Sequence, residues 1–202
     1  MISLHEKKRG VEVMRKAVFF PGTGYTCREA LFLRLKSLLE ARGWTVVPLE
    51  WSSIPFTPIE TVEEAGAIAL GFAICSLEGE DLDGCDEVLF VSKSLGCISA
   101  LKYSGLMGIA ARHVLLTPTP DALALISSST DVACAVIGDT DPLMKSADLA
   151  SYGRNHGFPV MVVDGVGHSL KTGDGESTGR ITGEIVSFVI DSLEARNRRQ
   201  WL

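Results

Sequence analysis

Apolar segments of two kinds alternate along almost the whole chain. Short runs rich in branched aliphatic residues, typical of strands, occupy residues 16–20, 45–49, 86–91, 113–116, 132–137 and 160–163. Segments with apolar residues at helical spacing lie between and after them, at 28–42, 59–77, 95–103, 143–155 and 179–195. The strand-like runs lack clean two-residue alternation, as expected where helices cover both faces of a parallel sheet. The pattern predicts an α/β protein, a three-layer α/β/α sandwich around a mostly parallel sheet of about six strands.

A single domain is expected to fill residues 16–202, a length sufficient to bury a hydrophobic core. Residues 1–15 are expected to form an N-terminal extension or, over Gly10 to Met14, an additional edge strand. Met14 directly precedes the first strand and is an alternative start of the chain. Only residues 117–131 separate the fourth and fifth strands, which leaves room for a turn and one short helix.

Charge, hydropathy and cysteine content limit which binding partners and which cellular location are expected for the protein. A net charge of −6 argues against a nucleic-acid partner, which requires a basic surface. No stretch is long and apolar enough to span a bilayer, and the N-terminal residues lack the apolar core of a signal peptide. The five cysteines are odd in number and contain no C-x-x-C pair. We therefore expect a cytoplasmic protein that binds neither membrane nor nucleic acid.

Three short polar segments follow three of the predicted strands. They are Ser92-Lys93-Ser94-Leu95-Gly96, then Gly138-Asp139-Thr140-Asp141-Pro142, then Gly165-Val166-Gly167-His168-Ser169-Leu170. Because the C-terminal ends of parallel strands meet at one edge of a sheet, these segments are expected to lie close together. A serine, an aspartate and a histidine in this order are the side chains of a nucleophile, an orienting acid and a general base.

The order and context of these segments resemble the α/β-hydrolase family, in particular small lidless serine hydrolases such as esterases and dienelactone hydrolases. Family members carry a nucleophile elbow, usually G-x-S-x-G, between a strand and a helix. Here Ser92 replaces the first glycine and Gly96 is kept, so the resemblance assigns the nucleophile to Ser94. It implies a minimal α/β-hydrolase fold. The short connection after the fourth strand implies that a lid domain is absent.

The resemblance also implies roles for other residues. His168 is the expected base. The family's G-x-x-D spacing favours Asp141 as its partner, although Asp139 remains an alternative. The backbone N–H groups of Leu95 and Thr23 are the expected oxyanion donors. Thr23 lies in the turn after the first strand, Pro21-Gly22-Thr23, where Gly24 is the alternative donor.

Further expectations concern substrate and partners. Tyr25, Met144 and Leu170 lie on loops expected to border Ser94 and are candidate substrate contacts, as is Lys93. The expected reaction is cleavage of a small carboxylic ester or related acyl bond through an acyl-enzyme, as in a carboxylesterase or thioesterase. An ester, a thioester and an amide stay open, as does acyl transfer to an acceptor other than water. No metal or organic cofactor is expected, because the residues around the site do not form a ligand set. The sequence leaves open whether a sheet edge pairs with a second copy to form a homodimer.

Two other functions fit parts of the sequence. A hydrolase fold can serve as a non-catalytic binding module, since fold does not guarantee activity. In addition, Gly22-Thr23-Gly24 between a strand and a helix, with Glu50 after the second strand, imitates a dinucleotide-binding unit. Cys27 stands where that fingerprint needs a third glycine, and the nucleotide-binding hypothesis leaves the three polar segments unexplained.

Overall fold

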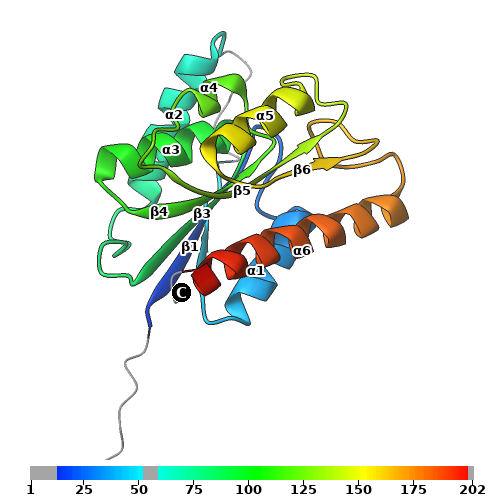
Figure 1. The fold of residues 1–202 in the computed structure, drawn as a ribbon. Coiled ribbons are helices and arrows are strands. Elements are labelled where there is room, and N and C mark those ends of the chain that lie inside the picture. The colour runs from blue at the N-terminus through cyan, green and yellow to red at the C-terminus, as the bar shows by residue number, and fades with distance from the viewer. Residues whose placement is uncertain (1–12, 52–58, 200–202) are drawn as a thin grey trace, which may run out of the picture.

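A parallel sheet of six strands forms the centre of the protein (Figure 1). The structure is a computed structural model and describes residues 13–51 and 59–199. The strand order is β2-β1-β3-β4-β5-β6, and every neighbouring pair runs parallel. The predicted α/β/α sandwich is confirmed. Of the predicted N-terminal extension, residues 1–12 lie outside the described residues, and the additional edge strand stays a prediction.

The elements alternate along the chain as the apolar pattern predicts. In order they are β1 (Arg15–Phe20), α1 (Ala30–Glu40), β2 (Thr45–Pro48), α2 (Val62–Ser76), β3 (Glu87–Lys93), α3 (Leu95–Met107), β4 (Ala111–Leu116), α4 (Pro120–Leu123), β5 (Asp131–Gly138), α5 (Ser146–His156), β6 (Val160–Val163) and α6 (Gly175–Arg199). The short helix expected between the fourth and fifth strands is α4, and its N-terminus is capped by the Thr119 side chain. None of the described helices is both long and apolar enough to cross a membrane.

Helices cover both faces of the sheet. Helices α1 and α6 lie together on one face, and α2, α3, α4 and α5 lie on the other (Figure 1). Each layer has its own hydrophobic core, with Phe19 and Leu89 directed to the α1/α6 side and Phe20 and Phe90 to the opposite side. Burial on both faces explains why the strands read as continuous apolar runs rather than as alternating ones.

The strand order reverses between β1 and β3. From β1 the chain passes through α1 to β2 at one edge, then returns through α2 to β3 on the other side of β1. In open parallel sheets, ligand sites form at such a reversal, at the C-terminal ends of the strands. The turn after β1 and the segment Ser92 to Gly96 both lie at this point.

Candidate active site

Ser94 lies in a strained turn between β3 and α3. Its backbone has φ 52° and ψ −118°, a conformation that non-glycine residues rarely adopt. The turn depends on small neighbours: a Cβ on Gly96 would lie 2.3 Å from the carbonyl oxygen of Phe20, so β1 and α3 approach too closely for any side chain there. Ser92 is tolerated in place of glycine because its hydroxyl is directed to β4, where it donates to the Val114 carbonyl at 3.2 Å. The segment has the geometry of a nucleophile elbow.

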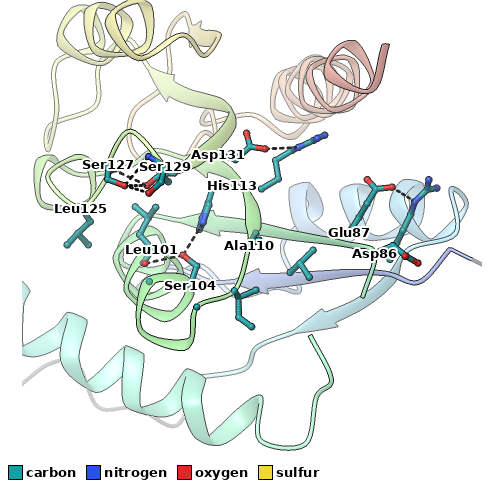
Figure 2. A pocket seen from close by; sticks show the side chains of 18 of the residues that line it. Asp86, Glu87, Leu101, Ser104, Ala110, His113, Leu125, Ser127, Ser129 and Asp131 are labelled. Atoms are coloured by element: carbon teal, nitrogen blue, oxygen red, sulfur yellow. Dashed lines mark hydrogen bonds and ion pairs between the residues drawn. The ribbon is translucent and has the colours of Figure 1, made fainter. Parts of the chain in front are cut away.

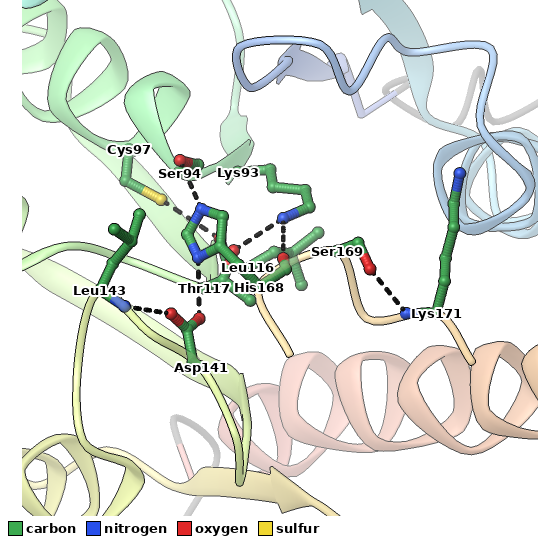
Figure 3. A network of polar contacts seen from close by, with 10 residues as sticks. All are labelled: Lys93, Ser94, Cys97, Leu116, Thr117, Asp141, Leu143, His168, Ser169 and Lys171. Carbon is green, nitrogen blue, oxygen red and sulfur yellow. Dashed lines mark hydrogen bonds and ion pairs between the residues drawn. The ribbon is translucent and has the colours of Figure 1, made fainter. Parts of the chain in front are cut away.

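Ser94, His168 and Asp141 form one chain of hydrogen bonds, which we call the triad. The Ser94 Oγ lies 2.7 Å from His168 Nε2, and His168 Nδ1 lies 2.8 Å from Asp141 Oδ2 (Figure 3). The second carboxylate oxygen of Asp141 accepts the backbone N–H of Leu143 at 2.9 Å. Of the two aspartates left open by the sequence, the structure places Asp141 against the histidine with its side chain fully buried, whereas Asp139 is exposed.

The close approach of two chain segments brings the histidine to the acid. His168 lies in the loop between β6 and α6, residues 164–174, here called the histidine loop. Hydrogen bonds from Asp139 N–H to the Val163 carbonyl and from Thr140 N–H to the Val166 carbonyl join this region to the end of β5. At Gly138, a Cβ would lie 2.1 Å from the Val166 carbonyl oxygen. Glycine at the end of β5 therefore permits the loop to cross directly over it.

The surroundings of His168 favour the neutral form of its imidazole. Partial burial and then the nearby Lys93 ammonium lower the pKa of His168 below its ordinary value of 6.5, while Asp141 opposes the shift. A neutral imidazole with Nδ1–H donated to Asp141 leaves Nε2 free to accept the Ser94 hydroxyl proton. This is the protonation state that a general base needs before reaction.

The turn after β1 lies beside Ser94. Gly22 and Tyr25 exchange two backbone hydrogen bonds, of 3.0 and 3.3 Å, and Gly24 takes the positive φ of 69° that this tight turn requires. A Cβ at Gly22 would lie 3.3 Å from the Cβ of Ser94, so Thr23 follows a residue in contact with the nucleophile. Leu95 is the first residue of α3, where the N–H has no acceptor within the helix. Both predicted oxyanion donors therefore belong to segments that adjoin Ser94, and their role stays a prediction.

Tyr25, Met144 and Leu170, three of the four candidate substrate contacts, are buried in the structure. Tyr25 and Leu170 pack in the core beneath α1 and α6, and Met144 packs in the opposite core. The Tyr25 ring makes an edge contact with Phe32. These residues shape the surroundings of the triad, and direct contact with a substrate stays a prediction for all three.

Lys93 differs from its predicted place. The sequence places it on a loop bordering the site, but β3 extends through Lys93 and the residue is 1% exposed. Its Nζ donates to the Thr117 hydroxyl at 2.7 Å and to the His168 carbonyl at 2.6 Å (Figure 3). A charged residue normally ends an apolar run at the surface, which is why the sequence pattern misplaces it. The signal available in the sequence is a lysine between a buried strand and a candidate nucleophile.

The glycine turn does not have the arrangement of a dinucleotide site. In that fingerprint the glycines open a helix whose N-terminus faces the phosphates. Here α1 begins only at Ala30, beyond the tight turn of Gly22 to Tyr25. Glu50, which would contact a ribose, forms an ion pair with Arg28 at 3.1 Å.

A cavity unrelated to the triad lies at the opposite edge of the sheet (Figure 2). It has a volume of about 780 Å³, and its lining comes from the N-terminal ends of the strands and the end of α3, without any of the triad residues. His113 lies beside it and contacts Ser104 at 3.2 Å. Within the described ranges, no group of three His, Cys, Asp or Glu side chains is placed to hold a metal ion.

Solved structures with the same architecture include α/β hydrolases. Est1E from Butyrivibrio proteoclasticus superposes with a TM-score of 0.63 at 12% identity, over 91% of this chain and 90% of that one. An α/β serine hydrolase homologue from Coxiella burnetii superposes with a TM-score of 0.63 at 14% identity, over 92% of this chain and 88% of that one. An α/β serine hydrolase without a lid from Xanthomonas campestris superposes with a TM-score of 0.62 at 12% identity, over 96% of this chain and 86% of that one. No protein-family model matches the chain, and no curated protein matches it in sequence. The similarity shows that the protein has the α/β-hydrolase fold.

Proposed function

We propose that the protein is a serine hydrolase that cleaves a small carboxylic ester or related acyl bond through an acyl-enzyme. One observation carries the proposal: three side chains from the ends of three different strands form a continuous hydrogen-bonded chain, of 2.7 and 2.8 Å, that begins at a strained serine. A serine that only caps a helix would need neither the strained backbone nor a histidine held by a buried carboxylate. The fold, shared with several hydrolases, is consistent with the proposal.

In the proposed mechanism, Ser94 attacks the carbonyl carbon of the substrate while His168 Nε2 accepts the hydroxyl proton. Asp141 holds the imidazole in the Nδ1–H form and stabilises the imidazolium that forms. His168 then donates the proton to the leaving group, which departs and leaves an ester on Ser94. Water, deprotonated by the same imidazole, hydrolyses this ester and restores the serine.

The negative oxygen of the tetrahedral intermediate needs backbone donors that are already in place. We assign this role to the N–H groups of Leu95 and Thr23. The dipole of α3 supports the assignment, because the helix begins at Leu95 and directs its positive end to the site. Loss of one such donor typically costs about 10²–10³ in turnover.

The proposed substrate is small because the element that could cover the site is short. Between β4 and β5 the chain forms only α4, a helix of four residues, where a lid would otherwise be inserted. A short-chain ester presented from solvent suits this arrangement better than a long acyl chain that needs an apolar tunnel.

The first experiment is intact-mass labelling with a fluorophosphonate, on the wild type and on Ser94→Ala. We expect one adduct on the wild type and none on the variant, followed by turnover in a panel of short-chain esters and thioesters. Ser92→Ala is the matched control, since Ser92 is two residues away but bonds β4 instead of His168. The absence of an adduct on folded wild type would refute the proposal and favour a non-catalytic binding module.

A further inference from the structure

Lys93 is a charged residue in the interior of the protein. Burying an ammonium is costly unless its hydrogens find acceptors. Here Thr117 Oγ1 and the His168 carbonyl oxygen accept from it, at 2.7 and 2.6 Å, and the Tyr25 ring lies beneath it with its centroid 4.7 Å away. These partners come from the segments that follow β4, β6 and β1. The ammonium therefore ties three separate segments to the strand that carries the nucleophile.

Backbone strain gathers around the same side chain. Among the described residues, the non-glycine residues with positive φ are Ser94, Thr117 and Leu170, with values of 52°, 45° and 57°. Ser94 directly follows Lys93, Thr117 binds its ammonium, and Leu170 lies two residues after His168. Strained conformations persist only where the surrounding structure holds them, and they cluster at functional sites. Lys93 is the side chain that contacts or adjoins each of the strained segments.

We propose that Lys93 is a positioning residue: its ammonium, bound at once to Thr117 and to the backbone of His168, holds the imidazole in line with Ser94. The inference deepens the serine-hydrolase function proposed above and rests on it. Lys93 does not contact substrate in this role, because it is almost completely buried. It acts through the place that it gives His168.

The charge of Lys93 has a second consequence for the site. Burial lowers the pKa of Lys93 to about 8, so the side chain is charged at neutral pH. The charged or titratable groups that face it are Asp141 after β5, His168 and Lys171 in the histidine loop, Tyr25 after β1 and the buried thiol of Cys97 in α3. Asp141 favours the charged form of Lys93, and Lys171 disfavours it.

The Lys93 charge also disfavours protonation of His168. Since the general base must be neutral, activity is expected to fall as the pH drops through the pKa of His168. Without the Lys93 charge, this decline should begin at a higher pH.

The test compares Lys93→Met with Lys171→Met. Both variants keep the aliphatic stem and remove an ammonium from beside the Tyr25 ring. Lys171, however, forms an ion pair with the partly exposed Glu29 and does not bind His168. The measurements are the rate of fluorophosphonate labelling and the pKa of His168 from NMR titration of ¹⁵N-labelled histidine. We expect Lys93→Met to slow labelling by about 10- to 100-fold and to raise the His168 pKa. Lys171→Met should change the labelling rate by less than about 2-fold.

A second pair of variants isolates the positioning from the charge. Thr117→Val removes one acceptor of the ammonium but retains Lys93 itself and the shape of residue 117, whereas Thr117→Ser keeps the hydroxyl. We expect Thr117→Val to be labelled about 10-fold more slowly than the wild type, with an unchanged His168 pKa. Thr117→Ser should be labelled at close to the wild-type rate. This pair also decides the case if Lys93→Met fails to fold.

The outcomes separate this proposal from the proposed function. Wild-type labelling rates in Lys93→Met, or equal rates in the two Thr117 variants, would overturn the positioning role while Ser94 remained the labelled nucleophile. Lys93→Met could instead lower the thermal stability and leave the His168 pKa unchanged, with Thr117→Val and Thr117→Ser labelled equally fast. That result would show that Lys93 has only a structural role, and it would also overturn the positioning role. If the wild type itself takes no label, the proposed function fails. In that case an unchanged His168 pKa in Lys93→Met would still overturn the proposed influence of Lys93 on His168, because the NMR titration does not depend on catalysis.

Discussion

Replacing Gly138 with alanine is expected to displace His168 without altering any residue of the triad. The backbone of Gly138 does not have a positive φ, so alanine is compatible with its conformation. The new Cβ, however, would lie 2.1 Å from the Val166 carbonyl oxygen and 2.7 Å from that of Gly167. Both atoms belong to the backbone of the histidine loop, so no side-chain rotation relieves the contact.

The size of the displacement follows from these distances. Real Cβ contacts are essentially never below 3.0 Å, so the loop must retreat from β5 by about 0.9 Å. If His168 moves by the same amount, its 2.7 Å contact with the Ser94 Oγ lengthens to about 3.6 Å, beyond hydrogen-bonding distance. A misplacement of about 1 Å in a catalytic group can cost about 10²-fold in rate, or about 2.7 kcal/mol. Overpacking should also lower the unfolding free energy by about 1–3 kcal/mol.

The assay is the rate of fluorophosphonate labelling, measured with the thermal unfolding midpoint of each variant. Gly167→Ala is the matched control: it lies in the same loop next to His168, but its Cβ would meet only ordinary contacts, the nearest being the Thr140 carbonyl oxygen at 3.6 Å. We expect slow labelling for Gly138→Ala and a nearly wild-type rate for Gly167→Ala. A Gly138→Ala variant that is folded, as stable as the wild type and labelled equally fast would refute the reasoning.

Two further predictions concern the acid of the triad and a buried histidine. Asp141→Asn should lower turnover by about 10⁴-fold, because an amide no longer fixes the Nδ1–H form of His168, whereas the exposed Asp139→Asn should leave turnover unchanged; equal losses in an ester assay would contradict the assignment. Burial lowers the pKa of His113 from 6.5 to about 4. Between pH 6.5 and pH 4, His113 is therefore protonated in the unfolded chain but neutral in the folded protein. Stability should therefore fall by about 3 kcal/mol as the pH drops from about 6.5 to 4. In denaturant titrations at several pH values His113→Gln should remove this part of the loss, and an unchanged pH dependence would argue against it.

Much of the fold could be predicted because the sequence pattern is local. A buried parallel strand needs a continuous apolar run, and an outer helix needs an apolar stripe, so each element leaves a signal within its own residues. The strand at 160–163 is predicted at the bounds that the structure gives to β6. Element ends are less accurate: α3 extends to Met107, four residues beyond its predicted end, because its last residues are exposed and no buried apolar position marks where the helix stops.

The candidate site was predictable where chemistry depends on short motifs. Ser94 and His168 follow apolar strands, and parallel strands direct their C-terminal ends to one edge of the sheet, so their proximity follows from topology. The choice between Asp141 and Asp139 was not decided by the residues alone. Both lie in one turn, and only the path of the histidine loop over Gly138 determines which carboxylate meets the imidazole.

The sequence by itself determined the element order, the parallel sheet and the segments that carry the serine, acid and histidine. Each of these depends on a pattern within a short stretch of neighbouring residues. Only the tertiary structure decided the position of Lys93. The sequence places it on a loop bordering Ser94, whereas the structure buries it, and its acceptors are Thr117 and His168, which lie 24 and 75 residues away along the chain. A buried charge is stable only when distant segments supply its partners, and their meeting is a property of the folded chain.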